Sequence, residues 1–300
     1  MSWTYLHSGI TIESELDMPE WERFRTARNI SADAQISRAA ASMQPTGVPD
    51  GTAVQRGSSI GFDVEGIGRW RIEGGSQILV EALMASQVPE LRLFTLGTAW
   101  AALGYQRGWL MCHGSAVVPA ESYGAVLLVG AAGQGKSTLA AALASRGGLL
   151  LSHDLCRAEA AGAEPPLLYP SAGQVKLWKD AVARLGWQER VAARDHFRHD
   201  KFICRPPPTA AVGGAPVPLK AVVVLAWGEA VRLERLEGAE ALTQVLAAAC
   251  YRPQMLDAIG GWSAQTRQWL EVLRSTLVYR LCRPRDCYEL ERTADLLEQV

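Results

Sequence analysis

The chain has 300 residues, of which 48 % are hydrophobic and 20 % charged, and its net charge at pH 7 is −1. This composition excludes a disordered protein, and the balanced charge argues against nucleic-acid and membrane-surface partners. The six cysteines form no CxxC pair, which favours reduced, mostly buried thiols over a disulfide framework or a zinc site. Without a signal-peptide pattern or an apolar run long enough to cross a bilayer, the sequence predicts a cytoplasmic protein.

Residues 1–87 are predicted to form a small β-rich N-terminal domain. Apolar and polar residues alternate within 8–16, 60–64 and 70–72, as in half-buried antiparallel strands. Residues 34–57 are rich in Ala, Ser, Gly and Pro, and they predict a short helix and a mobile loop. No catalytic constellation occurs in this part, and the lone His7 favours a packing or surface role.

Residues 88–300 are predicted to form a second, larger domain that begins with a helix over 88–108. An apolar strand follows at 109–118, interrupted by His113-Gly114-Ser115. Glycine weakens a strand interior and often marks the close approach of another backbone or a ligand. By itself, however, the pattern favours a core histidine that is satisfied by a hydrogen bond.

A phosphate-binding loop pattern, Gly-x-x-x-x-Gly-Lys-Ser, occupies residues 130–137 between an apolar strand at 124–129 and a strong helix former at 138–144. Its glycines let backbone N–H groups approach a polyphosphate closely, and the helix N-terminus adds partial positive charge. Lys136 would reach the β- and γ-phosphates, and the Ser137 hydroxyl would bind Mg²⁺. A glycine-rich turn before an ordinary helix is the alternative, but it leaves these two residues unexplained. The predicted nucleotide-binding residues are Gly130, Gly133, Gln134, Gly135, Lys136, Ser137 and Thr138.

A second apolar strand, at 149–154, ends in Ser152-His153-Asp154. In nucleotide-binding α/β sheets such a strand lies beside the loop strand, and an Asp at its carboxyl end can hold Mg²⁺ or its water. Asp154 is therefore predicted to bind the metal together with Ser137. An Asp that caps a turn is the alternative.

The rest of the chain carries weaker signals. The run at 194–202 is dense in charge and histidine, and it is either a solvated face or a group able to bind phosphate or move protons. The other expected elements are a strand at 167–170, a helix at 175–185, a loop at 206–218, a strand pair at 219–227 and 230–236, a helix at 239–250, helical structure to about 277, a strand at 278–282 and a helix at 293–300.

Taken together, the ordered set of motifs resembles the HPr kinase/phosphorylase superfamily. It is more closely similar to the smaller HPr-kinase-like serine kinases of biosynthetic clusters for modified peptides, including lasso peptides. The resemblance covers about 105–290 well and the N-terminal unit loosely, through Tyr5 to Pro19. The segments that carry it are His113-Gly114-Ser115, residues 130–137, Ser152-His153-Asp154, Lys176-Leu177-Trp178 and Tyr251-Arg252-Pro253.

The resemblance implies an α/β protein with a P-loop kinase domain of the HPr kinase/phosphoenolpyruvate carboxykinase type. It also implies ATP and Mg²⁺ as cofactors and a serine of a peptide or small protein as phosphoryl acceptor. By position, Lys136 and Ser137 would bind phosphate and Mg²⁺, His113 would lie near the transferred group, and His153 and Asp154 would supply base and metal functions. Full-length HPr kinases are hexamers, but the N-terminal unit differs here, so a homo-oligomer is left open.

One residue departs from the family pattern, because relatives carry two aspartates where this chain has His153-Asp154. Either His153 replaces the first carboxylate as the base, or Asp154 does both jobs. Imidazole titrates in a suitable range for a base but brings no negative charge to Mg²⁺. The leading hypothesis is a peptide serine kinase, and the alternatives are a small-molecule kinase and a nucleotide-binding module that has lost turnover.

Overall fold

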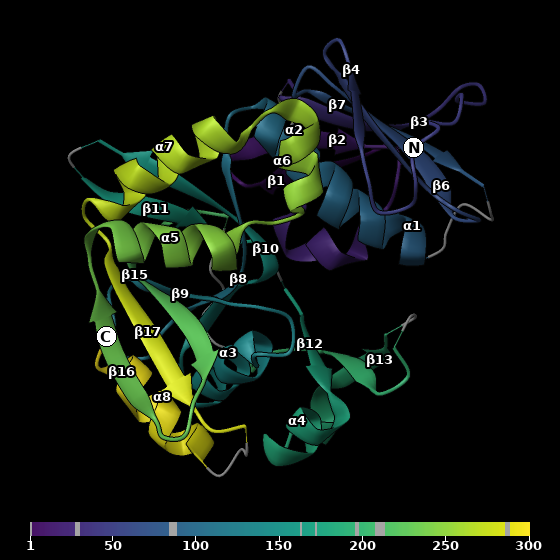
Figure 1. Cartoon of the computed structure of the whole chain (residues 1–300). Helices are drawn as coiled ribbons and strands as arrows, with labels where there is room; N and C mark the ends of the chain where they lie inside the picture. Colours follow the sequence, from purple (N-terminus) through teal and green to yellow (C-terminus); the bar gives the residue numbers. More distant parts are fainter. Residues whose placement is uncertain are drawn as a thin grey trace. The chain divides into compact units, whose positions relative to one another are not determined.

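The structure is a computed structural model that describes residues 2–27, 31–83, 89–162, 164–171, 173–195, 198–207, 214–285 and 289–300. The protein is a mixed α/β chain that divides into two compact units (Figure 1). The N-terminal unit comprises residues 1–111 and 251–267, and the C-terminal unit comprises 112–250 and 268–300. This division comes later than the domain boundary predicted at 87/88, because helices that follow residue 88 contact the first sheet.

A seven-stranded sheet forms the N-terminal unit. Its order is β1 (Trp3–His7), β2 (Ile10–Ser14), β3 (Ala34–Arg38), β7 (Gln77–Ala82), β6 (Gly68–Glu73), β5 (Ser59–Val64) and β4 (Val54–Arg56). β3 is parallel to both of its neighbours, and the other pairs are antiparallel. Buried and partly exposed residues alternate along β6, as the sequence pattern predicts. The short helix expected within 34–57 is wrong, because the buried Ala34 and Ile36 pair with β2 and β7.

Helices and an aromatic cluster cover this sheet. The helical segments are η1 (Pro19–Phe24), α1 (Pro89–Phe94), the π-helical η2 (Thr95–Ala99) and α2 (Trp100–Gln106), with α6 (Pro253–Ile259) in the same unit. The His7 ring is buried and stacks on Trp21 at a centroid distance of 4.1 Å, with Trp100 edge-on. The packing role predicted for His7 is confirmed.

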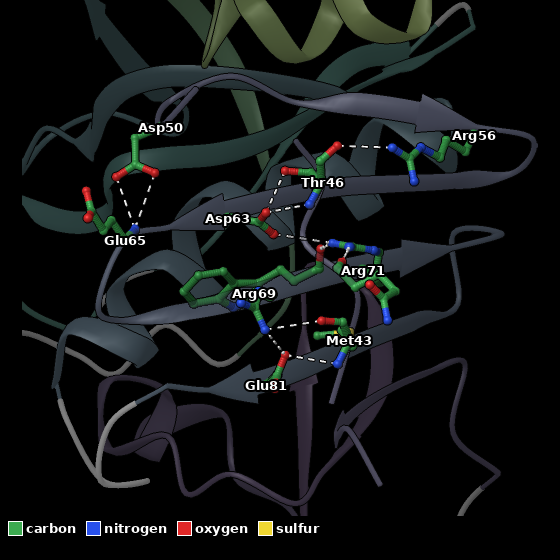
Figure 2. Close-up of polar contacts among 11 residues, drawn as sticks. Met43, Thr46, Asp50, Arg56, Asp63, Glu65, Arg69, Arg71 and Glu81 are labelled. Atoms are coloured by element: carbon green, nitrogen blue, oxygen red, sulfur yellow. Dashed lines mark hydrogen bonds and ion pairs between the residues drawn. The ribbon is translucent and has the colours of Figure 1, made fainter. Parts of the chain in front are cut away.

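Polar side chains of β5, β6 and β7 bind residues 43–46 to the sheet (Figure 2). The Asp63 carboxylate accepts hydrogen bonds from the N–H and the hydroxyl of Thr46, both at 2.6 Å. Glu81 pairs with Arg69 at 2.9 Å and accepts the Met43 N–H, while Arg69 donates to the Met43 carbonyl. These ion pairs are partly buried, so they hold a segment whose composition alone predicts a mobile loop.

The C-terminal unit contains a second seven-stranded sheet. Its order is β11 (Glu164–Tyr169), β10 (Leu149–Ala161), β8 (Leu110–Val118), β9 (Ala125–Val129), β15 (Val217–Trp227), β17 (Leu277–Arg283) and β16 (Arg232–Leu236). β9, β15 and β17 are parallel, so their carboxyl ends meet at one edge.

Two expectations about strand neighbours are wrong in this sheet. β10 does not lie beside the loop strand β9, because β8 forms an antiparallel pair with β9 and separates them. The strands expected at 219–227 and 230–236 are present as β15 and β16, but β17 lies between them. In both cases the intervening strand itself matches a predicted one, at 109–118 and at 278–282, but its place in the sheet was not predicted.

Helices and a small sheet complete the C-terminal unit. The helices are α3 (Lys136–Ser145), α4 (Lys179–Arg184), α5 (Gly238–Ala249) and α8 (Leu290–Glu298), and α7 (Trp262–Leu273) crosses the unit boundary. The helix expected over 175–185 is only partly correct. Val175 and Leu177 are buried in strand β12 (Val175–Trp178), which pairs with β14 (Lys201–Cys204) beside β13 (Val191–Arg194), and only α4 is helical.

Within the described ranges, no helix is long and apolar enough to cross a membrane. Part of two predicted segments, residues 196–197 of the charged run and 208–213 of the loop, lies outside the described residues.

Candidate functional site

The phosphate-loop pattern folds as a tight connection between β9 and α3, where the sequence predicts it. Gly130, Gly133 and Gly135 have φ angles of 148°, 84° and 72°, which residues with a Cβ rarely adopt. A Cβ on Gly130 would collide with the Gln134 side-chain oxygen and would lie 3.2 Å from the Leu225 carbonyl. The same Gln134 oxygen accepts the Ala131 N–H at 3.1 Å. The loop geometry therefore requires glycine, as a backbone cradle for phosphate would.

Lys136 begins α3 and is only 8 % exposed. Its ammonium donates to the carbonyls of Gly130 and Ala131, at 2.6 and 3.2 Å. Burial lowers the pKa of Lys136, although the nearby Asp154 carboxylate opposes the shift. The Lys136 amine is thus held in place by two carbonyl groups at the start of the loop.

Replacing Gly130 with alanine is expected to lower the free energy of unfolding by about 1–3 kcal/mol, the usual cost of a strained backbone, and to weaken nucleotide binding. Gly133→Ala is the matched variant, because it shares the positive φ but its Cβ meets no atom within 4 Å. Urea unfolding and ATP titration of both variants provide the check. Equal losses of nucleotide affinity would show that crowding at Gly130 is unimportant.

Ser137 contacts His153, which lies in β10. The His153 Nε2 is 3.0 Å from the Ser137 Oγ and accepts the Lys176 backbone N–H at 3.4 Å. An N–H group can only donate, so we assign Nε2 as the unprotonated nitrogen and the Ser137 hydroxyl as a second donor to it. Burial lowers the pKa of His153 to about 4; the cations Lys201 and Lys176 add to this shift, and Asp154 opposes it. The imidazole is therefore neutral at pH 7.

The pKa of His153 predicts how stability changes with pH. Because its folded pKa of about 4 lies below the unfolded value of 6.5, the neutral ring contributes stability above pH 6.5, and this is lost as pH falls toward 4. His153→Gln should therefore lose less unfolding free energy than the wild type between pH 7 and pH 5. Urea unfolding at the two pH values tests this, and parallel losses would contradict the assignment.

Asp154 contacts His113 of β8 across 3.3 Å, between its Oδ1 and the histidine Nε2. The register that sets Gly114 opposite Val129 places His113 beside the start of the loop. Asp154 has a φ of 79°, an uncommon left-handed conformation of the kind that concentrates at functional sites. Desolvation by the surrounding protein groups would by itself raise the pKa of Asp154, but the His113 hydrogen bond and the charges of His153 and Lys201 hold it well below its usual value. The carboxylate is ionised at neutral pH, and its side chain is 53 % exposed.

The predicted catalytic residues thus form two contacting pairs beside Lys136. The predicted metal ligands are split between them, because Ser137 contacts His153 and Asp154 contacts His113. Among the described residues, no cluster of three or more His, Cys, Asp or Glu side chains could hold a metal. One hydroxyl and one carboxylate are enough for a Mg²⁺ ion that is bound largely through phosphates and water. The donor set therefore fits Mg²⁺ bound together with a nucleotide, and it does not form a metal site made of protein ligands alone.

Three cationic residues near this site were not among the predicted site residues, although Lys176 lies in a segment that carries the resemblance and Lys201 lies in the charged run at 194–202. Lys176 and Lys201 lie on one face of the small sheet, since Lys176 is opposite Ile203 and Lys201 is opposite Trp178. Lys176 pairs with Asp195 at 2.9 Å. Burial and nearby Arg198 lower the pKa of Lys201, while Asp154 opposes the shift. The Val175–Leu177 alternation is the signal that would have placed Lys176 on a strand.

Arg283 is the third of these cationic residues. It is the last residue of β17, and its guanidinium donates to the Gln134 carbonyl inside the phosphate loop. The sequence places Arg283 directly after the strand predicted at 278–282. The sequence does not indicate that the end of this strand lies close to the phosphate loop.

Comparisons with known proteins add a distant similarity. No family model matches the chain, and no curated protein matches it by sequence. Among solved structures, the chain is similar to the HPr(Ser) kinase/phosphatase from Coxiella burnetii, with 14 % sequence identity and a TM-score of 0.31. The match covers 63 % of this chain and 86 % of that chain. Because the similarity is so low, the functional interpretation depends on the site's own contacts.

Proposed function

We propose that the protein is an ATP- and Mg²⁺-dependent kinase that transfers the γ-phosphoryl group to a serine hydroxyl of a peptide. The observation that carries the proposal is the contact set at residues 130–137. A glycine-dependent loop holds Lys136, and the His153 ring and the Asp154 carboxylate lie beside its first helical turn. Phosphoryl transfer needs mainly alignment and neutralisation of charge, and these groups are suited to both.

The loop would hold the β- and γ-phosphates through its backbone N–H groups, Lys136 and the N-terminus of α3. Ser137 and Asp154 would bind Mg²⁺, which supplies neutralisation of the charge on the phosphates when it is bound. The hydrogen bond from Ser137 to His153 engages the serine hydroxyl proton and would leave the oxygen lone pairs for the cation. Under this proposal, His153 acts as a positioning residue for Ser137.

Asp154 is the better proton acceptor for the serine hydroxyl of the substrate. The Nε2 of His153 already accepts two hydrogen bonds, whereas Asp154 is ionised and half exposed. A weakly basic carboxylate suits a loose transition state, in which the hydroxyl proton is released late. His113 would keep the carboxylate oriented.

A peptide acceptor is supported by an exposed aromatic side chain near Lys201, whose charge also acts on Asp154. Trp178 is 45 % exposed, and the Lys201 ammonium lies 5.6 Å from the centre of its ring. Incubation with ATP, Mg²⁺ and a co-encoded precursor peptide should add the mass of one phosphoryl group to a serine. A small-molecule kinase would instead release ADP with a simple alcohol or metabolite and leave every peptide unmodified.

A nucleotide-binding module without turnover is the second candidate. The contact of His153 with Ser137 favours it. Members of the family that the sequence resembles carry an aspartate at the position of His153, so the metal site here would have one negative charge fewer. Tight ATP binding without hydrolysis or transfer in the wild type, with transfer gained in His153→Asp, would establish this candidate and exclude the kinase. Transfer by the wild type would exclude the module.

A further inference from the structure

An aromatic and cationic stack stands at the carboxyl ends of β15 and β17. Trp227 and Arg283 are directly opposite each other in this parallel pair. The Arg283 guanidinium lies 4.6 Å from the centre of the Trp227 ring, and that of Arg285 lies 5.9 Å from it. Both Trp227 and Arg283 are partly exposed. The stack therefore offers flat, delocalised surfaces at the sheet edge where ligands of α/β proteins bind.

This stack adjoins the phosphate loop. Arg283 donates to the Gln134 carbonyl, and a Cβ on Gly135 would lie 2.8 Å from one of its terminal nitrogens. Arg283 thus lies between the loop and Trp227, in contact with both. None of the groups proposed for phosphoryl transfer uses this side of the loop.

The order of strands gives the loop two different flanks. On one flank, β8 and β10 carry His113, His153 and Asp154, and on the other flank β15 and β17 carry Trp227 and Arg283. A γ-phosphate turned toward Asp154 would leave the opposite flank open to the sugar and base of the same nucleotide. Aromatic and guanidinium planes are the surfaces on which nucleobases stack.

We propose that Trp227 and Arg283 form the nucleobase subsite of the nucleotide site. The inference rests on the proposed function only in that a nucleotide occupies the loop. Trp227 supplies the stacking surface, and Arg283 fixes the position of that surface relative to the loop by its bond to Gln134. Because every base has a π-face, stacking of this kind selects for the presence of a base more than for its identity.

Binding of Mg-ATP and of Mg-tripolyphosphate, which has no base, separates this subsite from the loop. Calorimetric titration of the wild-type chain should show ATP binding at least about tenfold tighter than tripolyphosphate, the scale of one stacked base. Trp227→Leu should lose about tenfold in ATP affinity with tripolyphosphate affinity unchanged. Tyr123→Leu, at a 99 % exposed ring in the same unit, should change neither.

Two results would overturn the inference while leaving the proposed function standing. One is equal affinity of the wild type for ATP and tripolyphosphate, which needs no variant and so does not depend on whether Trp227→Leu folds. The other is an unchanged ATP affinity in a folded Trp227→Leu protein. Failure of the wild type to bind either compound would instead remove the phosphate site itself, and with it the proposed function.

Discussion

Lys136→Ala is expected to lower the rate of phosphoryl transfer by about 10²- to 10³-fold, the effect of removing one preorganised charge-stabilising group. The reason is that Lys136 is the only buried cation whose ammonium is bonded to the loop carbonyls among the described residues. The fold should persist, because the substitution removes a desolvated ammonium whose pKa is lowered by burial. Steady-state kinetics of ADP formation, with thermal unfolding in parallel, measure both effects.

Lys179→Ala is the matched control for this prediction. Lys179 is exposed and lies at the start of α4 in the same unit, so its loss should leave the kinetics within about twofold, as for most surface substitutions. If the kinetics of Lys136→Ala were also unchanged, residues 130–137 would not be a phosphate-binding loop.

Asp154→Asn is expected to reduce kcat by about 10²- to 10⁴-fold, the range for a lost general base. The variant removes the negative charge but keeps the shape of the side chain. Asparagine also tolerates the left-handed backbone at this position better than alanine does, so the fold should be retained. ATP affinity without Mg²⁺ should change little, whereas the Mg²⁺ dependence of turnover should weaken. Turnover and nucleotide titrations at several Mg²⁺ concentrations separate these effects.

Asp180→Asn provides the comparison for this variant, because Asp180 is an exposed carboxylate on α4. A kcat for Asp154→Asn equal to that of Asp180→Asn would mean that Asp154 neither accepts the proton nor holds the metal. His153 would then be the remaining candidate for the base.

Sequence patterns predicted the elements whose signals are local. The loop at 130–137 carries a fixed spacing between an apolar strand and a helix former, and the structure has β9, the positive-φ glycines and α3 in that order. The helical stretch after residue 88 and the strand that contains His113 are confirmed for the same reason. In each case the residues that define the element are neighbours in the chain.

Strand neighbours could not be predicted because they depend on contacts between distant residues. β8 separates β9 from β10, and β17 separates β15 from β16. The sequences of the strands themselves carry no signal for either arrangement. The helix predicted over 175–185 is correct only from Lys179 to Arg184, because a four-residue strand is joined directly to this short helix. Apolar spacing over so few residues does not distinguish the two periods.

The sequence predicted which residues belong to the candidate site, but it did not predict which of them contact one another. His113, Lys136, Ser137, His153 and Asp154 gather around one loop, but the bond from Ser137 to His153 and the pair of His113 with Asp154 depend on how β8 and β10 align. Arg283 was missed because it lies 147 positions after Lys136 in the sequence. Only the parallel register of β15 and β17 brings it to the loop.

The most direct test of the central claim is the stoichiometry of transfer. The wild-type protein, ATP, Mg²⁺ and a serine-containing precursor peptide should yield ADP and phosphopeptide in equal amounts, measured by chromatography and mass spectrometry on the same samples. Lys136→Ala should yield neither above background. ADP without phosphopeptide, or no ADP at all with any acceptor, would contradict a kinase that acts on peptide serine.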